Sequence, residues 1–152
     1  MNRSTSSATA LFDTSSLLAG LLEDHPAHVR AFPWMEKVQR GEITGYISLH
    51  TLAELYSNLT GKLGSSLGIG IADALRMIEV NVLTLFEIVS LTTDDYIAIL
   101  TNAAAVGMKG GAISDGIIGF AAWKQGVDSL VTLNKKHFDS LYPSETARMV
   151  EP

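Results

Sequence analysis

The sequence predicts an α/β fold, a three-layer α/β/α sandwich with a central, mostly parallel sheet. Short apolar segments of strand length alternate along the chain with longer segments whose apolar residues recur at helical spacing. Such an alternation gives strand–helix–strand units, which place parallel strands side by side and helices on both faces of the sheet. The chain has 152 residues, about one domain's worth, so we expect a single domain over residues 10–152.

Short apolar segments predict the strands of this sheet. They are expected at Ala10–Phe12, Gly45–Leu49, Phe86–Val89 and Leu130–Thr132, with a short last strand at Arg148–Val150. None of these segments is longer than a typical strand, and helical segments separate the first four. The pattern therefore favours parallel crossovers over hairpins.

Helical spacing of apolar residues predicts the covering helices. They are expected at Ser15–Leu22, His28–Arg40, Thr51–Leu59, Ile71–Val80, Thr93–Val106 and Asp115–Gln125. Ser15 or Thr14 would cap the first helix. Pro33 predicts a kink or a split in the second helix, and Thr51 has capping-box spacing to Glu54 in the third.

Two segments are expected to lie outside the regular elements. Residues 1–9 are polar and rich in Ser and Thr, which predicts a flexible leader. Residues 61–70 contain four glycines and two serines and predict a mobile loop between helices. Polar residues interrupt the first apolar stretch, so no signal peptide is expected. No run of about 18 apolar residues predicts a membrane span.

Composition excludes several classes of protein. The chain has no cysteine, which excludes disulfides, thiolate zinc sites and a cysteine nucleophile and is compatible with a cytoplasmic location. Hydrophobic residues make up 47% and charged residues 18%, which argues against intrinsic disorder. The net charge of −5 argues against a highly basic nucleic-acid binder. Contact with a phosphate backbone would therefore need a local basic patch or bound cations.

Polar residues that could do chemistry follow the expected strands. Asp13 follows the first strand, Thr132 and Asn134 follow the fourth, Glu54 lies in the helix after the second, and Asp115 begins a later helix. Ligands of open parallel sheets bind outside the carboxyl ends of the strands, where these elements converge. Clustered carboxylates repel one another unless a cation lies between them, and Mg²⁺ prefers such oxygen ligands. The sequence therefore predicts a divalent-metal site that could activate water against a phosphodiester.

Each of these residues also has a simpler structural interpretation. Asp13 could cap a helix, and Glu54 could complete a capping box. Asp115 could favour the dipole of its helix, and Asn134 could form a turn with its own backbone. The functional interpretation depends on the group as a whole rather than on any single member.

Four segments together resemble the PIN domain family and, within it, the VapC-type ribonuclease toxins of toxin–antitoxin pairs. The segments are Phe12-Asp13-Thr14-Ser15, Leu52-Ala53-Glu54-Leu55, Ile113-Ser114-Asp115-Gly116-Ile117-Ile118 and Val131-Thr132-Leu133-Asn134-Lys135-Lys136-His137-Phe138. The resemblance covers nearly the whole chain after the leader. It implies an α/β/α sandwich, Mg²⁺- or Mn²⁺-dependent cleavage of RNA, an antitoxin partner and a homodimer.

The resemblance also implies roles for individual residues. Asp13, Glu54 and Asp115 match the acidic positions that hold metal, and Asn134 matches a fourth position that is often Asp. Ser15 matches a hydroxyl residue that orients the first Asp. Thr132 matches the hydroxyl residue of the Thr-x-Asp/Asn motif.

The third segment departs from the family pattern, because Gly116 and Gly119 stand in its helix at a cost of about 1 kcal/mol each relative to Ala. These glycines could permit close packing or loosen the helix.

Basic residues give candidate RNA contacts, although a solvated surface is the simpler interpretation of each group. Those near the expected site are Lys135, Lys136 and His137, and those at near-helical spacing on an earlier segment are Arg30, Lys37 and Arg40. The other histidines, His25, His28 and His50, lack ligand spacing and are expected at the surface or in packing.

Two functions of different classes follow from the sequence. The first is a metal-dependent endoribonuclease of the toxin type. The second is a catalytically degenerate PIN domain that binds RNA or a protein, which the neutral Asn134 and the acidic net charge would suit. A phosphatase of the haloacid-dehalogenase type would need Asp-x-Asp, and Asp13 is followed by Thr14 and Ser15 instead.

Overall fold

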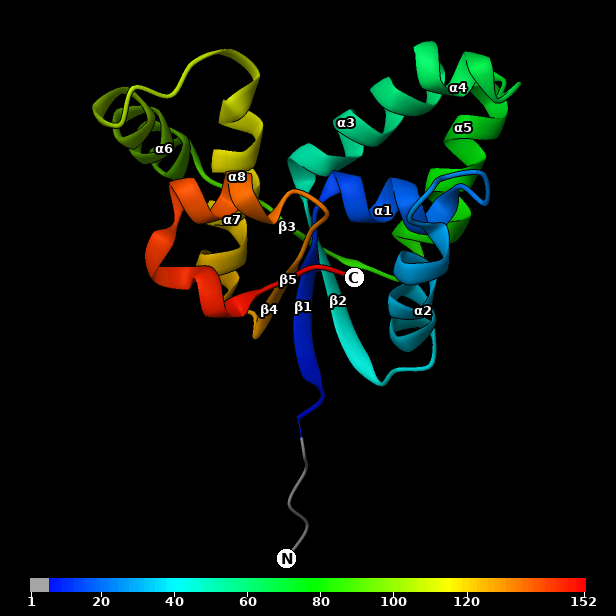
Figure 1. The fold of residues 1–152 in the computed structure, drawn as a ribbon, viewed down its shortest axis with the longest axis horizontal. Coiled ribbons are helices and arrows are strands. Elements are labelled where there is room, and N and C mark those ends of the chain that lie inside the picture. The colour runs from blue at the N-terminus through cyan, green and yellow to red at the C-terminus, as the bar shows by residue number, and fades with distance from the viewer. Residues whose placement is uncertain (1–5) are drawn as a thin grey trace, which may run out of the picture.

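A parallel sheet forms the middle of the molecule (Figure 1). The computed structural model describes the backbone of residues 6–152 and the side chains of all of these except 146 and 147. The strands are β1 (Ala8–Phe12), β2 (Ile43–Ser48), β3 (Glu87–Val89), β4 (Ser129–Val131) and β5 (Met149–Val150). Their order is β3-β2-β1-β4-β5, and every neighbouring pair is parallel. The predicted sheet is confirmed, with β1 at its centre.

Helices cover both faces of the sheet. They are α1 (Thr14–Leu21), α2 (His28–Gln39), α3 (Leu49–Thr60), α4 (Lys62–Ser66), α5 (Ile71–Ile78), α6 (Thr93–Ala105), α7 (Ile113–Gln125) and α8 (Lys135–Leu141). A π-helical turn, η1 (Glu79–Leu83), follows α5, and two 3₁₀ turns, η2 (Gly110–Ala112) and η3 (Pro143–Arg148), precede α7 and β5. Helices α1 to α5 lie on one side of the sheet and α6 to α8 on the other (Figure 1). The three-layer α/β/α fold is therefore confirmed.

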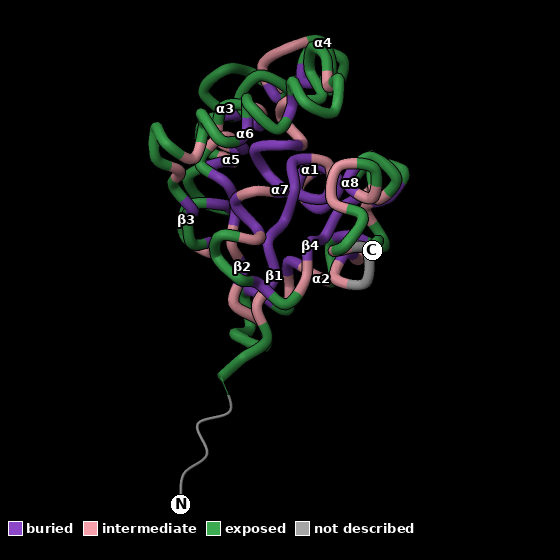
Figure 2. Tube along the Cα trace, turned by 90° about the vertical axis from the view of Figure 1, so that its left-hand side faces the viewer, coloured by how far each residue is buried: buried purple, intermediate pink, exposed green. Residues whose placement is uncertain are grey.

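Two hydrophobic cores lie on opposite faces of β1. Successive side chains of a strand point to opposite faces, so Phe12 packs with Leu17 and Leu55 beneath α1 and α3. Leu11 packs instead with Ile118 and Phe138 beneath α7 and α8. Figure 2 shows the buried trace running through the middle of the molecule. The two cores fix α3 and α7 on either side of the end of β1.

The ends of several elements differ from the prediction. Strand β1 starts at Ala8, two residues before the predicted start at Ala10, because Ala8 and Thr9 also pair with β2. Thr9 N in addition donates to Asp128 Oδ2 over 2.8 Å. The predicted leader therefore ends before Ala8, and its residues 1–5 lie outside the described residues. At the other end of the chain, Arg148 belongs to η3, and β5 contains only Met149 and Val150.

The cap predicted for α3 was wrong, whereas one of the caps considered for α1 is confirmed. Asp13, and not Ser15 or Thr14, caps α1. Ser48 caps α3, and Thr51 lies buried inside that helix, so Thr51 and Glu54 form no capping box. In α6 the cap is Thr92, which forms a capping box with Asp95.

The glycine-rich segment 61–70 was predicted to be a mobile loop, and this prediction was wrong, because it contains α4. Gly64 is buried against the end of α3, where a Cβ atom would overlap the carbonyl oxygen of Leu59. Glycine therefore lets two short helices approach closely at this turn. The predicted split at Pro33 is also absent, since α2 runs through it as one helix.

Within the part of the chain that the structure describes, no helix combines the length and the apolar character needed to cross a membrane.

Candidate active site

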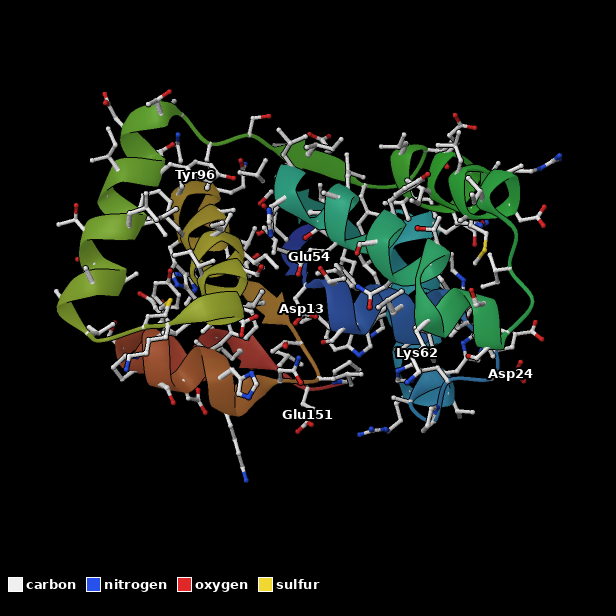
Figure 3. All side chains as sticks on the ribbon, turned by 90° about the horizontal axis from the view of Figure 1, so that it is seen from above. Asp13, Asp24, Glu54, Lys62, Tyr96 and Glu151 are labelled. Carbon is white, nitrogen blue, oxygen red and sulfur yellow. The ribbon has the colours of Figure 1, made fainter. Side chains whose placement is uncertain are left out.

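The candidate site lies at the carboxyl ends of the central strands. Asp13 directly follows β1, and Thr132 directly follows β4, its neighbour in the sheet. Glu54 comes from α3 on one side of the sheet and Asp115 from α7 on the other. Viewed from above the sheet, Asp13 and Glu54 lie near the middle of the molecule with helices on both sides (Figure 3). The edge predicted from the topology is thus where these residues lie.

Asp13 is almost completely buried, with 2% of its surface exposed. Its Oδ1 accepts hydrogen bonds from Ser16 N (2.9 Å) and Ser15 Oγ (2.8 Å), and its Oδ2 accepts one from Thr132 Oγ1 (2.6 Å). The carboxylate therefore caps α1 and also binds the end of β4. The structural interpretation of Asp13 as a helix cap is therefore confirmed.

The surroundings of Asp13 act on its charge in two directions. Burial raises its pKa above the usual value, while hydrogen bonds from Thr132, the Ser16 backbone and Ser15 oppose this rise. The net shift of the pKa is upward, so ionised Asp13 is less stable here than in water. A cation beside it would remove that cost, which is the electrostatic condition for a metal ligand.

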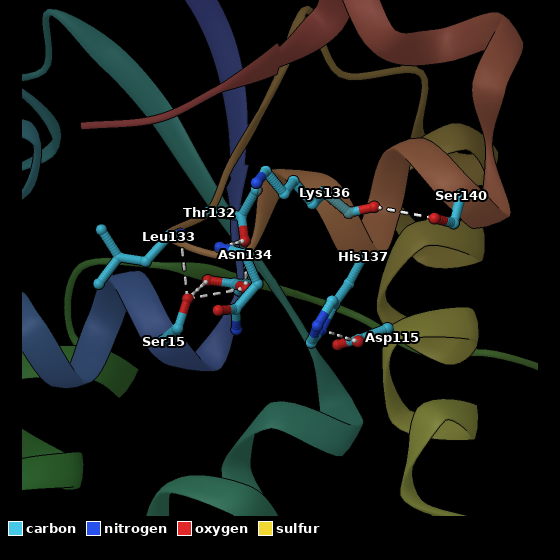
Figure 4. Close-up of polar contacts among 9 residues, drawn as sticks. Ser15, Asp115, Thr132, Leu133, Asn134, Lys136, His137 and Ser140 are labelled. Carbon is cyan, nitrogen blue, oxygen red and sulfur yellow. Dashed lines mark hydrogen bonds and ion pairs between the residues drawn. The ribbon is translucent and has the colours of Figure 1, made fainter. Parts of the chain in front are cut away.

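Ser15 and Thr132 orient Asp13 and the chain after β4 together. Ser15 Oγ donates to Asp13 and accepts from Leu133 N over 3.1 Å. Thr132 Oγ1 donates to Asp13 and accepts from Asn134 N over 2.9 Å. Figure 4 shows Ser15 and Thr132 side by side, with Leu133 and Asn134 next to them. Ser15 and Thr132 are therefore the two side-chain hydroxyls that hold the Asp13 carboxylate in place.

Glu54 is directed toward the site by two neighbours. Thr14 Oγ1, at the start of α1, donates to Glu54 Oε1 over 2.8 Å. His50 Nε2, one turn earlier in α3, lies 3.9 Å from the same oxygen. The side chains of both His50 and Glu54 are 27% exposed, so the glutamate still reaches solvent.

Asp115 faces a cavity of about 410 Å³ and pairs with a histidine. His137 Nδ1 lies 3.4 Å from Asp115 Oδ2 (Figure 4). Burial raises the pKa of Asp115, His137 opposes the rise, and the negative charge of Glu54 adds to it. Glu54 and Asp115 are therefore close enough to repel across the site. The cavity is lined by Gly111, Ala112, Asp115, His137, Ser140 and Leu141.

The residues after β4 extend the site on one side. Asn134 is exposed, begins α8 and makes no capping hydrogen bond with its side chain. Lys135 and Lys136 form the first turn of α8, and Lys136 is exposed. His137, with a side chain 69% exposed, lies beside Asp115. Of these basic groups, His137 contacts a carboxylate of the site, and the two lysines precede it in the same helix turn.

The donor set suits a hard divalent cation, although the carboxylates are held separately. Asp13, Glu54 and Asp115 supply oxygen ligands, the type that Mg²⁺ and Mn²⁺ prefer. Each is bound by its own partner, Thr132, Thr14 and His137 respectively. Among the side chains described, no three His, Asp or Glu residues form a group that could hold a metal ion. Assembly of a metal site would therefore require these side chains to reorient.

The basic residues of α2 are not part of this cluster. Arg30 donates to the backbone oxygen of Pro152, Lys37 lies over the ring of Trp34, and Arg40 pairs with Glu36 and Glu42. Arg40 also precedes β2, whose first residue pairs with the start of β1, so it lies at the opposite edge of the sheet. Of this predicted group, Arg40 thus lies away from the carboxylates.

Several residues of the site were not identified from the sequence. Thr14 was considered only as a cap, and His50 was assigned to surface or packing, yet both contact Glu54. His50 also contacts Ser114, beside Asp115. The four-residue spacing of His50 and Glu54 was the available signal, since such residues share a helix face. The contact with Ser114 had no local signal.

Comparison with known proteins gives a match to one protein family and similarity to several solved structures. A family model described as the PIN domain matches residues 10–142. No curated protein matches the chain.

Similar solved structures include VapBC2 from Rickettsia felis bound to a DNA fragment from its promoter, with 18% identity, TM-score 0.64, and 95% of this chain and 98% of that chain covered. PAE2754 from Pyrobaculum aerophilum has 20% identity, TM-score 0.61 and coverage of 95% and 91%. FitAcB from Neisseria gonorrhoeae has 22% identity, TM-score 0.59 and coverage of 87% and 92%. At these identities the similarity establishes the fold.

Proposed function

This chain belongs to the PIN domain family, and from that premise we propose that it is a metal-dependent endoribonuclease, the VapC-type toxin of a toxin–antitoxin pair. PIN domains are generally nucleases. The observation that carries the proposal is the buried Asp13 at the end of the central strand, with Glu54 and Asp115 directed to the same edge from opposite layers. The substrate class, RNA, follows from the resemblance of the four sequence segments.

The proposed mechanism assigns the acidic residues to metal binding and the neighbouring groups to orientation. Asp13, Glu54 and Asp115 would hold Mg²⁺ or Mn²⁺, and Asn134 would provide a neutral oxygen nearby. Such an ion supplies activation of water and stabilisation of charge on the phosphate. Ser15 and Thr132 fix the orientation of Asp13, and Thr14 fixes that of Glu54. Lys135, Lys136 and His137 would attract the phosphate backbone beside this acidic edge.

The same proposal includes partners and location. We propose an antitoxin that binds this chain and a homodimer, both acting in the cytoplasm. An antitoxin partner is supported by the similarity to VapBC2. Exposed apolar residues on α4 and α5, which a partner could cover, also support association; they include Leu63, Ile71 and Leu75. Light scattering after size-exclusion chromatography would test the dimer.

A cleavage assay with Asp13→Asn tests the activity. The purified chain should cleave RNA with Mg²⁺ or Mn²⁺ and lose cleavage when EDTA removes the metal. Asn keeps the cap of α1 but carries no charge, so D13N should fold, by circular dichroism, and reduce cleavage at least about a hundredfold. Asp24→Asn is the matched control, since Asp24 is exposed and outside the site. Cleavage by D13N at the rate of D24N would refute the proposal.

A binding module without activity is the second candidate. It is favoured by the neutral Asn134 and by the separate partners of the three carboxylates. Calorimetric titration with Mn²⁺ distinguishes the two functions. Binding that D13N abolishes supports the nuclease, whereas no binding at millimolar Mn²⁺, with RNA binding retained, supports the module.

A further inference from the structure

The first turn of α7 is stabilised mainly by side chains of other elements. Its N-cap, Ala112, provides no side-chain hydrogen bond, and glycines at 110, 111 and 116 favour other conformations. Three consecutive residues in this turn each contact a side chain outside α7: His50 Nε2 lies 3.0 Å from Ser114 Oγ, His137 Nδ1 lies 3.4 Å from Asp115 Oδ2, and Tyr142 Oη donates to the Gly116 carbonyl over 2.6 Å. The position of Asp115 therefore depends on contacts from outside α7.

His50 connects this turn to the helix that carries Glu54. It lies in the first turn of α3, after the Ser48 cap, and its Nε2 is directed at Ser114 on the opposite side of the site. The same nitrogen lies 3.9 Å from Glu54 Oε1, beyond hydrogen-bond length, so the bond to Ser114 is the dominant contact. One side chain thus contacts both Glu54 and the residue before Asp115, which come from different layers.

Glu54 and Asp115 are like charges carried by different helices at one edge of the sheet. His50 Nε2 lies 3.0 Å from Ser114 Oγ, next to Asp115, and 3.9 Å from Glu54 Oε1, so it links the surroundings of the two carboxylates. The two helices pack on different hydrophobic cores, Leu55 of α3 on one face of the sheet and Ile118 of α7 on the other. The hydrogen bond between His50 and Ser114 adds a direct polar link between the two helices at the level of the carboxylates, beside the contact of α3 with α7.

We propose that His50 is a positioning residue, which through Ser114 sets the placement of Asp115 relative to Glu54 for binding of a divalent cation. This role rests on the proposed function. His50 is not a ligand in this scheme and does not touch the substrate. A residue that only packs would contribute to stability without changing metal affinity.

Four variants and one control test the proposal. His50→Leu and Ser114→Ala each remove one partner, and the double variant removes both. His50→Gln keeps an amide that can donate to or accept from Ser114. His28→Leu is the matched control: His28 is also half-buried, its ring bonds the Ala19 carbonyl over 2.9 Å, and it lies outside the site.

The first measurement is amide hydrogen exchange without metal. It follows residues 117–120, whose N–H groups bond to carbonyls in the first turn of α7. Loss of one hydrogen bond predicts about fivefold faster exchange in H50L and in S114A, and no further acceleration in the double variant. H50Q and H28L should match the unmodified chain. Unchanged exchange in H50L would show that His50 does not order this turn and would overturn the proposal.

The second measurement is Mn²⁺ affinity by calorimetry. H50L and S114A should each weaken binding about fivefold, the double variant no more than either, and H50Q should restore it. If amide exchange is faster in H50L but its affinity for Mn²⁺ is unchanged, His50 has only a structural role, and the proposal is overturned. If the unmodified chain binds no Mn²⁺, the proposed function itself fails, and the positioning role fails with it even where exchange shows the contact.

Discussion

At the scale of single residues, Asp13 is a buried carboxylate surrounded by neutral donors. The groups that favour its charged form are the hydroxyls of Ser15 and Thr132 and the backbone N–H of Ser16. Such donors orient a carboxylate without neutralising it. A cation could therefore bind Asp13 without first displacing a lysine or an arginine, a displacement that would cost part of the binding free energy.

The raised pKa of Asp13 predicts how its replacement changes stability with pH. Below pH 3.8, the ordinary pKa of an aspartate side chain, Asp13 is protonated in both folded and unfolded chains. As pH rises from there through the higher folded pKa, the unfolded chain loses its proton first, so this group makes the folded state less stable. D13N lacks this titration and should have a higher free energy of unfolding than the unmodified chain at pH 7.

Urea unfolding between pH 4 and pH 7 measures this effect. The advantage of D13N should shrink as pH falls toward 3.8. Asp24→Asn, which alters an exposed carboxylate, should show no comparable trend. An advantage for D13N that grew on acidification would contradict the raised pKa.

At the scale of elements, α7 contains two glycines that differ in their surroundings. Gly119 lies under the ring of Tyr142, and a Cβ atom there would overlap Tyr142 Cε2. The ring cannot easily move, because its hydroxyl bonds the Gly116 carbonyl and the ring makes a T-shaped contact with Trp123. At Gly116 a Cβ atom would lie 3.6 Å from Met108, an ordinary contact. Close packing thus explains Gly119 but not Gly116.

These surroundings predict opposite effects of alanine at the two positions. Gly116→Ala should stabilise the chain by about 0.5–1 kcal/mol through helix propensity. Gly119→Ala should destabilise it by about 1–3 kcal/mol, because the overlap outweighs the same propensity gain. Urea unfolding of both variants measures the difference. Combining Gly119→Ala with Tyr142→Ala should remove the overlap, so a G119A penalty that persists in the Tyr142→Ala background would contradict the assigned cause.

Prediction from the sequence succeeded where local pattern determines structure. The strand–helix alternation predicted the parallel sheet, and the rule for carboxyl ends of strands placed Asp13 and Thr132 together. It failed at caps such as Ser48, where neighbouring polar residues compete for one position, and at Gly64, whose close approach to Leu59 has no local signature. The contact between His50 and Ser114 spans 64 residues, so only the folded chain reveals it.

At the scale of the whole molecule, the acidic chain has its candidate site between two layers that pack on separate cores. The net charge is −5, and at the edge of the sheet the negative charge of Glu54 raises the pKa of Asp115. A ligand that binds only the folded chain and contacts both layers stabilises the entire domain. Thermal unfolding therefore reports on occupancy of the site without any substrate.

Addition of Mn²⁺ should raise the melting temperature of the unmodified chain. At a hundred times the dissociation constant the gain is about 2.7 kcal/mol, or roughly 5–10 °C for a domain of this size. Glu54→Gln and D13N should lose most of this shift, because each removes a charged ligand. An equal shift in D13N would place the binding of Mn²⁺ elsewhere on the chain.

The order β3-β2-β1-β4-β5 places β1 two strands from either rim of the sheet. Fraying begins at the rim, where β5 has two residues and β3 has three. Asp13 directly follows the innermost strand, and its amide donates to Val131 O on β4. The edge strands β3 and β5 can thus open in a thermal fluctuation while Asp13 keeps its position. We therefore expect the central strand, which carries Asp13, to unfold last.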